Sequence, residues 1–234
     1  MTQKTMLKRL ALKDSDFEEI KQAVVEAEKS TSGEIALALT AESSSYAFWE
    51  LLSSILTSCA LFVCIFPLSA QVYSWLDSML WGMKPSYLTA FYFVVCALLV
   101  LVLYCFYNIP AVDRLIIPLG ARNSAVSSGA MKYFAESGVY CTKEHSGILI
   151  YVSYFEKQVR IIADKGISEK ISPDLWKLIA DEMTENLAGG NAKEAYLGAI
   201  KRCGELLAEN FPCGKENPDE LNDGLVIVER GKWE

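Results

Sequence analysis

Two acidic residues occupy positions from which their carboxylates could act together. Glu34 leads into the apolar run Glu34–Leu39, which is typical of a buried strand, and Asp164 ends a second such run, Val159–Asp164. If the sheet brings these strand ends to one edge, the two carboxylates can hold a hard divalent cation such as Ca²⁺ through oxygen ligands. The alternative is structural, because Asp164 suits a turn before Gly166 and Glu34 could face water.

The neighbouring polar residues do not complete a recognisable catalytic site. Lys165 could position a phosphate, although a lysine in a turn is usually solvated. His145 is the only histidine, and in KEHSG it precedes Ser146 in a pattern typical of an exposed turn. The sequence has no GxxxxGK[ST] loop, no GxSxG elbow and no cysteine followed by arginine at phosphatase-loop spacing. We therefore assign no catalytic residue and no cofactor site.

Charge and cysteine content argue against two further classes of function. The formal net charge is −7, and the acidic balance argues against nucleic acid as a partner, since nucleic-acid binding needs a positive face. The seven cysteines show no zinc-like CxxC spacing and no disulfide framework. They indicate small hydrophobic residues in a reducing compartment.

Two apolar runs, Tyr46–Leu68 and Leu88–Tyr107, meet the length of about 20 residues that a membrane-spanning helix needs. We expect them to form a transmembrane hairpin in the lipid bilayer. Serine and threonine residues in the first run are expected to bond back to its own carbonyls or to face the partner helix. Lys84 is the only basic residue between the spans, so we expect both termini to be cytoplasmic. Aromatic residues between the spans favour the membrane interface; these are Tyr73, Trp75, Trp81 and Tyr87.

The sequence around the hairpin predicts alternating helices and strands. The spacing of Ser15 and Glu18 predicts a capping box for a helix that runs to about Lys29, and Gly33 predicts a left-handed cap after it. A second helix is expected from near Asn123, with Gly138 as its terminator.

The C-terminal half has stronger signals. The strands Gly147–Tyr154 and Val159–Asp164 are expected to pair as an antiparallel hairpin. Ser172 and Pro173 open a third helix that ends at Gly189-Gly190. Asn191 caps a fourth, which stops before Pro212, and LVIVER is expected to add a strand at a sheet edge.

These elements predict an α/β fold, in which a central mixed sheet is flanked by helices on both faces and is interrupted by the two-helix transmembrane hairpin. One helix and one strand bury too little surface to fold alone. Residues 1–45 should therefore supply the first helix and strand of a cytoplasmic domain, residues 46–107 the hairpin with spans of about 46–68 and 88–107, and residues 108–234 the remainder of the same domain.

Three segments resemble the TPM domain family in type and order. They are the helix ending in TSGEIALAL, the segment YFAESGVYCTKEHSGILIYVSYFEKQVRIIADKGI, and the helix of Trp176 with its Gly-Gly stop. The family is named after a thylakoid lumen protein, a photosystem II repair protein and a nematode acetylcholine-receptor modulator. The chain looks like the bacterial branch in which membrane spans separate the first strand from the rest.

The resemblance implies an α/β sandwich in a bacterial inner or plasma membrane protein. The family is labelled phosphatase-like, and some members are associated with acid phosphatase activity or calcium binding, whereas others assist membrane protein complexes. Two hypotheses follow. The favoured one is a membrane-anchored interaction, assembly or auxiliary factor with a membrane protein partner. The alternative is a metal-assisted phosphomonoesterase that uses Glu34 and Asp164 as metal ligands.

Overall fold

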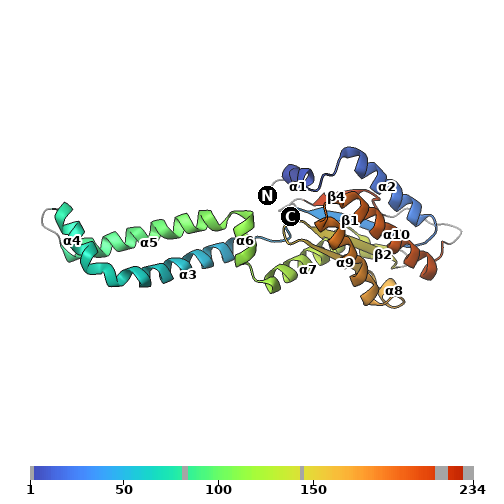
Figure 1. Cartoon of the computed structure of the whole chain (residues 1–234). Helices are drawn as coiled ribbons and strands as arrows, with labels where there is room; N and C mark the ends of the chain where they lie inside the picture. Colours follow the sequence, from blue (N-terminus) through green and yellow to red (C-terminus); the bar gives the residue numbers. More distant parts are fainter. Residues whose placement is uncertain (1–2, 81–83, 143–144, 214–220, 229–234) are drawn as a thin grey trace. The chain divides into compact units, whose positions relative to one another are not determined.

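The computed structural model describes residues 3–80, 84–142, 145–213 and 221–228. The chain divides into two compact units, one formed by Met1–Ser44 with Gly120–Glu234 and the other by Ser45–Leu119 (Figure 1). The elements of the first unit are α1 (Gln3–Arg9), α2 (Asp14–Glu28), β1 (Glu34–Thr40), α7 (Leu119–Glu136), η2 (Val139–Cys141), β2 (Gly147–Ser153), β3 (Gln158–Ala163), α8 (Lys165–Ser168), α9 (Pro173–Ala188), α10 (Ala192–Asn210) and β4 (Leu225–Val228). Those of the second are α3 (Ala47–Ile65), η1 (Phe66–Leu68), α4 (Ser69–Met79), α5 (Pro85–Tyr107) and α6 (Pro110–Ile116).

The sheet is mixed and its strands follow the order β3-β2-β1-β4. The central strand β1 pairs in parallel with β2, with Glu34 opposite Gly147, and in parallel with β4, with Leu37 opposite Leu225. The edge strand β3 is antiparallel to β2. All seven residues of β1 and of β2 are buried. The predicted mixed sheet and the β2–β3 hairpin are therefore confirmed, and the final strand lies at a sheet edge as expected.

Helices cover both faces of the sheet, as the unbroken apolar runs of β1 and β2 predicted. Because alternate strand residues point to opposite faces, each strand contributes to two cores. One core joins β1 and β2 to α2, α9 and α10; its members include Ile35, Leu37, Leu39, Ile148, Ile150, Ile20, Trp176, Ile179, Tyr196 and Leu207. The other joins the opposite faces of β1 and β2 to α7; it includes Ala36, Ala38, Leu149, Tyr151, Val126, Ala130 and Phe134.

The α7 face of the sheet is packed closely because small residues stand where the elements meet. A Cβ atom on Gly129 would lie 2.8 Å from the Tyr151 hydroxyl, so α7 can approach β2 only with glycine there. Gly147 has the same role at the start of β2, where a side chain would collide with the carbonyl oxygen of Val139. Helix α7 and η2 thus fix the position of β2 beneath them.

The helix predicted to run to about Lys29 is confirmed as α2, but the two caps predicted for it are wrong. Helix α2 begins at Asp14, and its capping box joins Lys13 to Asp16, whose Oδ2 accepts the Lys13 amide at 2.8 Å. The Ser15–Glu18 pair has the same spacing but lies two residues later in the chain. Gly33 is not left-handed; it is required because a Cβ there would lie 2.8 Å from the Leu207 side chain.

The remaining helix signals are largely confirmed. The Ser172 hydroxyl caps α9 by accepting the Asp174 amide at 3.4 Å, and Pro173 occupies the first turn. Gly138 is left-handed, with φ of +80°, and follows α7. Asn191 precedes α10 but makes no side-chain cap. The short helices α1, α6 and α8 were not predicted, because they are too brief to show a helical period.

The second unit is a helical hairpin, in which α3 packs against α5 (Figure 1). Two stretches, Ala47–Met79 and Ser86–Tyr107, are long and apolar enough to cross a membrane. The segment between the predicted spans is not an open loop, since α4 carries Tyr73 and Trp75 and α5 begins before Tyr87. Trp81 lies outside the described residues.

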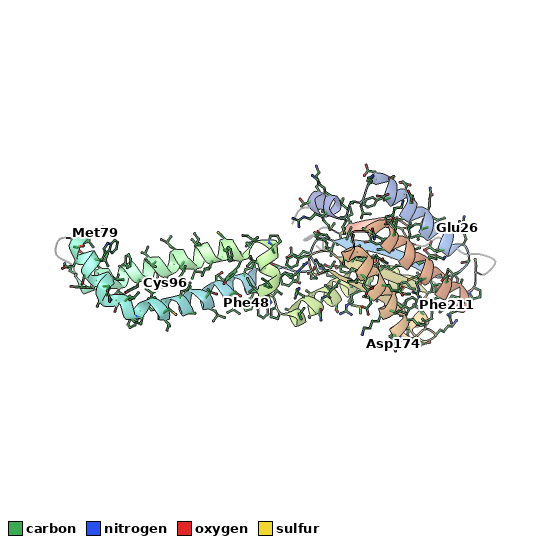
Figure 2. The ribbon with its side chains drawn as sticks, in the orientation of Figure 1. Glu26, Phe48, Met79, Cys96, Asp174 and Phe211 are labelled. Carbon is green, nitrogen blue, oxygen red and sulfur yellow. The ribbon has the colours of Figure 1, made fainter. Side chains whose placement is uncertain are left out.

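Polar groups of α3 point inward rather than outward. Ser54 and Ser58 are buried, and the Ser54 hydroxyl donates to the Glu50 carbonyl oxygen at 2.6 Å. Between the helices, the Thr57 and Tyr107 hydroxyls lie 2.8 Å apart, and the Asn108 amide donates to Glu50 Oε2 at 2.7 Å. Both expected arrangements of the serines and threonines occur. They leave an apolar outer surface with projecting side chains such as Phe48 and Met79 (Figure 2).

Two buried tyrosines provide a matched test of this packing. Burial raises the pKa of both, but the Tyr151 hydroxyl lies 3.3 Å from Ser43 Oγ, whereas the Tyr196 hydroxyl has no hydrogen-bond partner in the described part of the chain. Tyr196→Phe should therefore leave the free energy of unfolding unchanged or raise it by up to about 1 kcal/mol, and Tyr151→Phe should lower it by about 0.5–1.5 kcal/mol. Urea unfolding of the full chain in detergent measures both changes. Equal losses in the two variants would contradict this account.

Candidate functional site

The two acidic residues predicted as ligands lie at the same end of the sheet, where β1 and β2 begin, and on either side of β2. Glu34 is opposite Gly147 in the parallel register, and its amide donates to the Ser146 carbonyl at 3.1 Å. On the other side, the Asp164 amide donates to the Gly147 carbonyl at 2.9 Å. Strand alternation places Glu34 on the α7 face of the sheet with Ala36, and the pairing with Gly147 places Asp164 at the matching position. Gly147, which has no side chain, therefore separates the two acids.

For each acid the alternatives are a metal ligand and a purely structural residue. The structure excludes the solvent-facing position for Glu34, and it gives Asp164 a structural role. Glu34 is 2% exposed, so the reading in which it faces water is wrong. Burial of a carboxylate is costly unless polar groups surround it. Asp164 is 8% exposed and has a structural role, because its Oδ1 caps α8 by accepting the Lys165 amide at 2.6 Å.

Asp164 also contacts His145, a pairing that was not predicted. His145 Nδ1 lies 3.1 Å from Asp164 Oδ2, and the imidazole side chain is 65% exposed. His145 has φ of +51° in the turn that precedes β2. The antiparallel β2–β3 register contains the signal that could have found this contact, since the residues just before β2 and just after β3 must be neighbours.

Hydrogen bonds to the backbone hold the rest of this edge. Ser146 is buried; its hydroxyl donates to the Ser32 carbonyl at 2.8 Å, and its amide donates to Thr142 Oγ1 at 3.0 Å. Lys165 is solvated, with its ammonium 3.9 Å from Glu169. Ser146 is thus a structural residue here, and Lys165 has a carboxylate partner.

The donor types at this edge suit a hard cation, which prefers carboxylate and carbonyl oxygens. Within the described residues, no three His, Cys, Asp or Glu side chains gather as a metal-binding group. A cation held by Glu34 and Asp164 would thus need carbonyl oxygens or water as further ligands. It would also compete with His145 and the Lys165 amide for the Asp164 oxygens.

A second buried polar cluster lies at the opposite end of the sheet, where β1 and β2 end. Glu156 is 3% exposed; it accepts the Ser43 amide at 3.0 Å and the Ser153 hydroxyl. The Ser43 hydroxyl donates to Ser153 Oγ at 2.8 Å. These bonds fasten the segment after β1 to the β2–β3 turn. The sequence carried no signal for this cluster, because a glutamate in a predicted turn is normally solvated.

Fold and site together define an α/β protein whose mixed sheet has helices on both faces and whose sequence is divided by an apolar hairpin. Residues 114–206 match the model of the TPM domain, a family that is phosphatase-like in name. The family resemblance stated from the sequence is therefore confirmed for this part of the chain. The match includes β2, β3 and α9, whereas β1 and β4 lie outside it.

A solved structure supports the fold. The NMR structure of the BA42 protein from the psychrophilic bacterium Bizionia argentinensis sp. nov. is similar, with a TM-score of 0.55 and 21% sequence identity. The similarity covers 93% of this chain and 95% of that one. At this identity the likeness concerns the fold alone. The comparison with curated proteins gives no match.

Proposed function

We propose that this protein is a membrane-anchored TPM-domain protein that acts as an interaction, assembly or auxiliary factor for a membrane protein complex. The observation that carries the proposal is the hairpin of α3 and α5. The apolar window of α5 has none of its residues buried, so its Leu, Val and Phe side chains require an apolar surrounding such as lipid or a partner's helices. The buried Glu50 and Ser54 complete this inside-polar, outside-apolar arrangement.

A surface of the α/β unit supports binding of a partner. Leu175 and Leu178 on α9 are 40% and 46% exposed, and they border a hollow of about 140 Å³ that also includes Ile179 and Leu206. Charged groups stand at its rim, among them Arg202, which is bound by Glu182. An apolar centre with a charged rim is the usual anatomy of a protein interface.

The α9 surface can be tested by crosslinking in native membranes. With benzoylphenylalanine in place of Leu178, we expect one discrete adduct with a membrane protein, because this side chain lies in the proposed contact. The same probe in place of Val25, which is 38% exposed on α2, is the control and should give no adduct. Identical adducts at both positions, or repeated isolation of the protein alone in mild detergent, would count against the proposal.

The proposed topology has both termini in the cytoplasm and α4 on the other side of the membrane. A membrane-impermeant maleimide added to intact spheroplasts should then modify a Ser78→Cys variant on α4. The exposed native Cys213 should react only after the membrane is permeabilised. Modification of Cys213 in intact spheroplasts would exclude this orientation.

A second function, that of a metal-assisted phosphomonoesterase, draws support from the positions of Glu34 and Asp164. The backbones of both residues pair with the start of β2, Glu34 opposite Gly147 and the Asp164 amide on the Gly147 carbonyl. A cation there would activate water or polarise a phosphoryl oxygen, and the two acids would hold it. Asp164 would act as a ligand, and His145, in contact with it, would orient the carboxylate.

This second function predicts phosphomonoester hydrolysis that depends on a divalent cation. If Asp164 is a metal ligand, Asp164→Asn should reduce kcat/KM by roughly 10–100-fold, as is typical for weakened metal coordination. The matched control is Glu169→Gln, since Glu169 is a nearby exposed acid that contacts only Lys165 among the described ion pairs. Purified full-length protein without metal-dependent turnover, or with equal turnover in both variants, would exclude this activity.

A further inference from the structure

A cavity of about 460 Å³ lies beside the carboxyl end of β2. Helix α1, the β2–β3 turn and the end of α9 border it, and it is open to solvent on the side of the exposed Arg9 and Lys157. Its lining includes Arg9, Leu10, Val152, Lys157, Val159 and Leu187. The volume falls within the range of roughly 300–1,000 Å³ that is usual for small-molecule sites. It also lies at the carboxyl end of parallel strands, where α/β proteins commonly bind ligands.

The charge of this cavity is unusual for so acidic a chain. Two cations, Arg9 and Lys157, line it, and no Asp or Glu is among the lining residues that the structure describes. Across the same described residues, neither cation makes a side-chain hydrogen bond or an ion pair. The protein has a formal net charge of −7, but an anion in this cavity would be attracted by two cations. It would not have to displace a carboxylate of the described residues from either of them.

Other hollows of the same unit have their cations neutralised. Arg202 lines the two hollows along α9 and α10, where Glu182 binds its guanidinium at 2.6 Å. Lys132 lines a hollow beside α7, and its ammonium lies 3.8 Å from Glu136. The cavity beside β2 is therefore distinguished by its available positive charge.

Lys157 lies in the β2–β3 turn, directly after a buried acid. Lys157 has φ of +52°, which is unfavourable for a residue with a side chain, and its amide donates to the Tyr154 carbonyl at 3.3 Å. The preceding residue, Glu156, is buried and accepts bonds from Ser43 and Ser153. The carboxylate adjacent in sequence is therefore committed elsewhere.

Part of the cavity wall is apolar. Leu10, Val152 and Val159 belong to the main core, and the partly buried Leu187 packs against that core and also lines the cavity. A free inorganic anion would leave this wall in contact with water, whereas a molecule with an apolar body would cover it. From the two cations and this wall we infer that the cavity binds a small amphipathic anion, with a carboxylate or phosphate head at Arg9 and Lys157 and an apolar body against Leu10 and Val159.

This site is independent of the proposed function. It lies at the carboxyl end of β2, whereas Glu34 and Asp164 lie at the amino end, beside Gly147. Loss of phosphomonoesterase activity or of a protein partner would leave it untouched.

The test uses the full chain in phosphatidylcholine nanodiscs and 2-naphthoate as a fluorescent probe that no phosphatase can hydrolyse. We expect saturable binding at one site per chain, with the neutral 2-naphthamide at least about tenfold weaker, since a charge-assisted hydrogen bond contributes about that factor. Arg9→Gln and Lys157→Gln should each weaken 2-naphthoate binding about tenfold. Lys8→Gln removes the same charge from the same helix outside the cavity and should leave binding unchanged.

A substitution that fills the cavity tests whether binding needs its space as well as its two cations. Ala188 is an exposed lining residue, so Ala188→Trp should abolish binding without altering the charge or the core. Nanodiscs that contain phosphatidylglycerol identify the source of the ligand: competition with 2-naphthoate assigns the site to an anionic lipid, and its absence assigns it to a soluble anion. Equal binding of the acid and the amide, or an equal loss in Lys8→Gln and Arg9→Gln, would overturn the inference.

Discussion

The position of β1 is the constraint on which the rest of the structure depends. This strand is central and fully buried, and it pairs in parallel with both β2 and β4. Side chains anchor the approach to it, since the Glu28 carboxylate accepts the Ile35 amide at 2.7 Å and the Thr31 hydroxyl donates to the Phe211 carbonyl at 2.6 Å. Parallel pairing of β1 with β2 requires the chain to return to the amino edge, and α7 with η2 makes that return. The amino end of β1 then sets Glu34 beside Gly147, and the segment after it sets Ser43 beside Glu156.

Much of the fold could be predicted because short sequence patterns determine its strands, turns and helix starts. Continuous apolar runs gave β1 and β2, the short connection after Tyr154 gave their antiparallel neighbour, and Ser172 with Pro173 marked the start of α9. The errors concern the caps of α2 and the role of Gly33, where more than one residue or contact could explain the same sequence pattern. Asp16 competes with Ser15 and Glu18 for the helix cap, and Gly33 is explained by its contact with Leu207, which only the tertiary structure creates.

The candidate sites were harder to predict than the fold, because their properties depend on burial. Strand ends indicated that Glu34 and Asp164 would share an edge, but the contact of Asp164 with His145 requires the exact hairpin register. The burial of Glu156 and the cavity between Arg9 and Lys157 follow from packing among three or more elements. Sequence patterns describe one element at a time, so such sites have no local signature.

The division of the sheet in the sequence has a consequence for synthesis. β1 leaves the ribosome about a hundred residues before β2, so at a translation rate of roughly 5–20 residues per second the central strand waits on the order of 5–20 seconds for its first partner. During that interval its apolar side chains and both of its edges are open to other nascent chains. The apolar hairpin emerges within the same interval, so α3 and α5 can pack against each other before the sheet closes. The sheet of the α/β unit can therefore form only after β2 has been synthesised, long after β1 has left the ribosome.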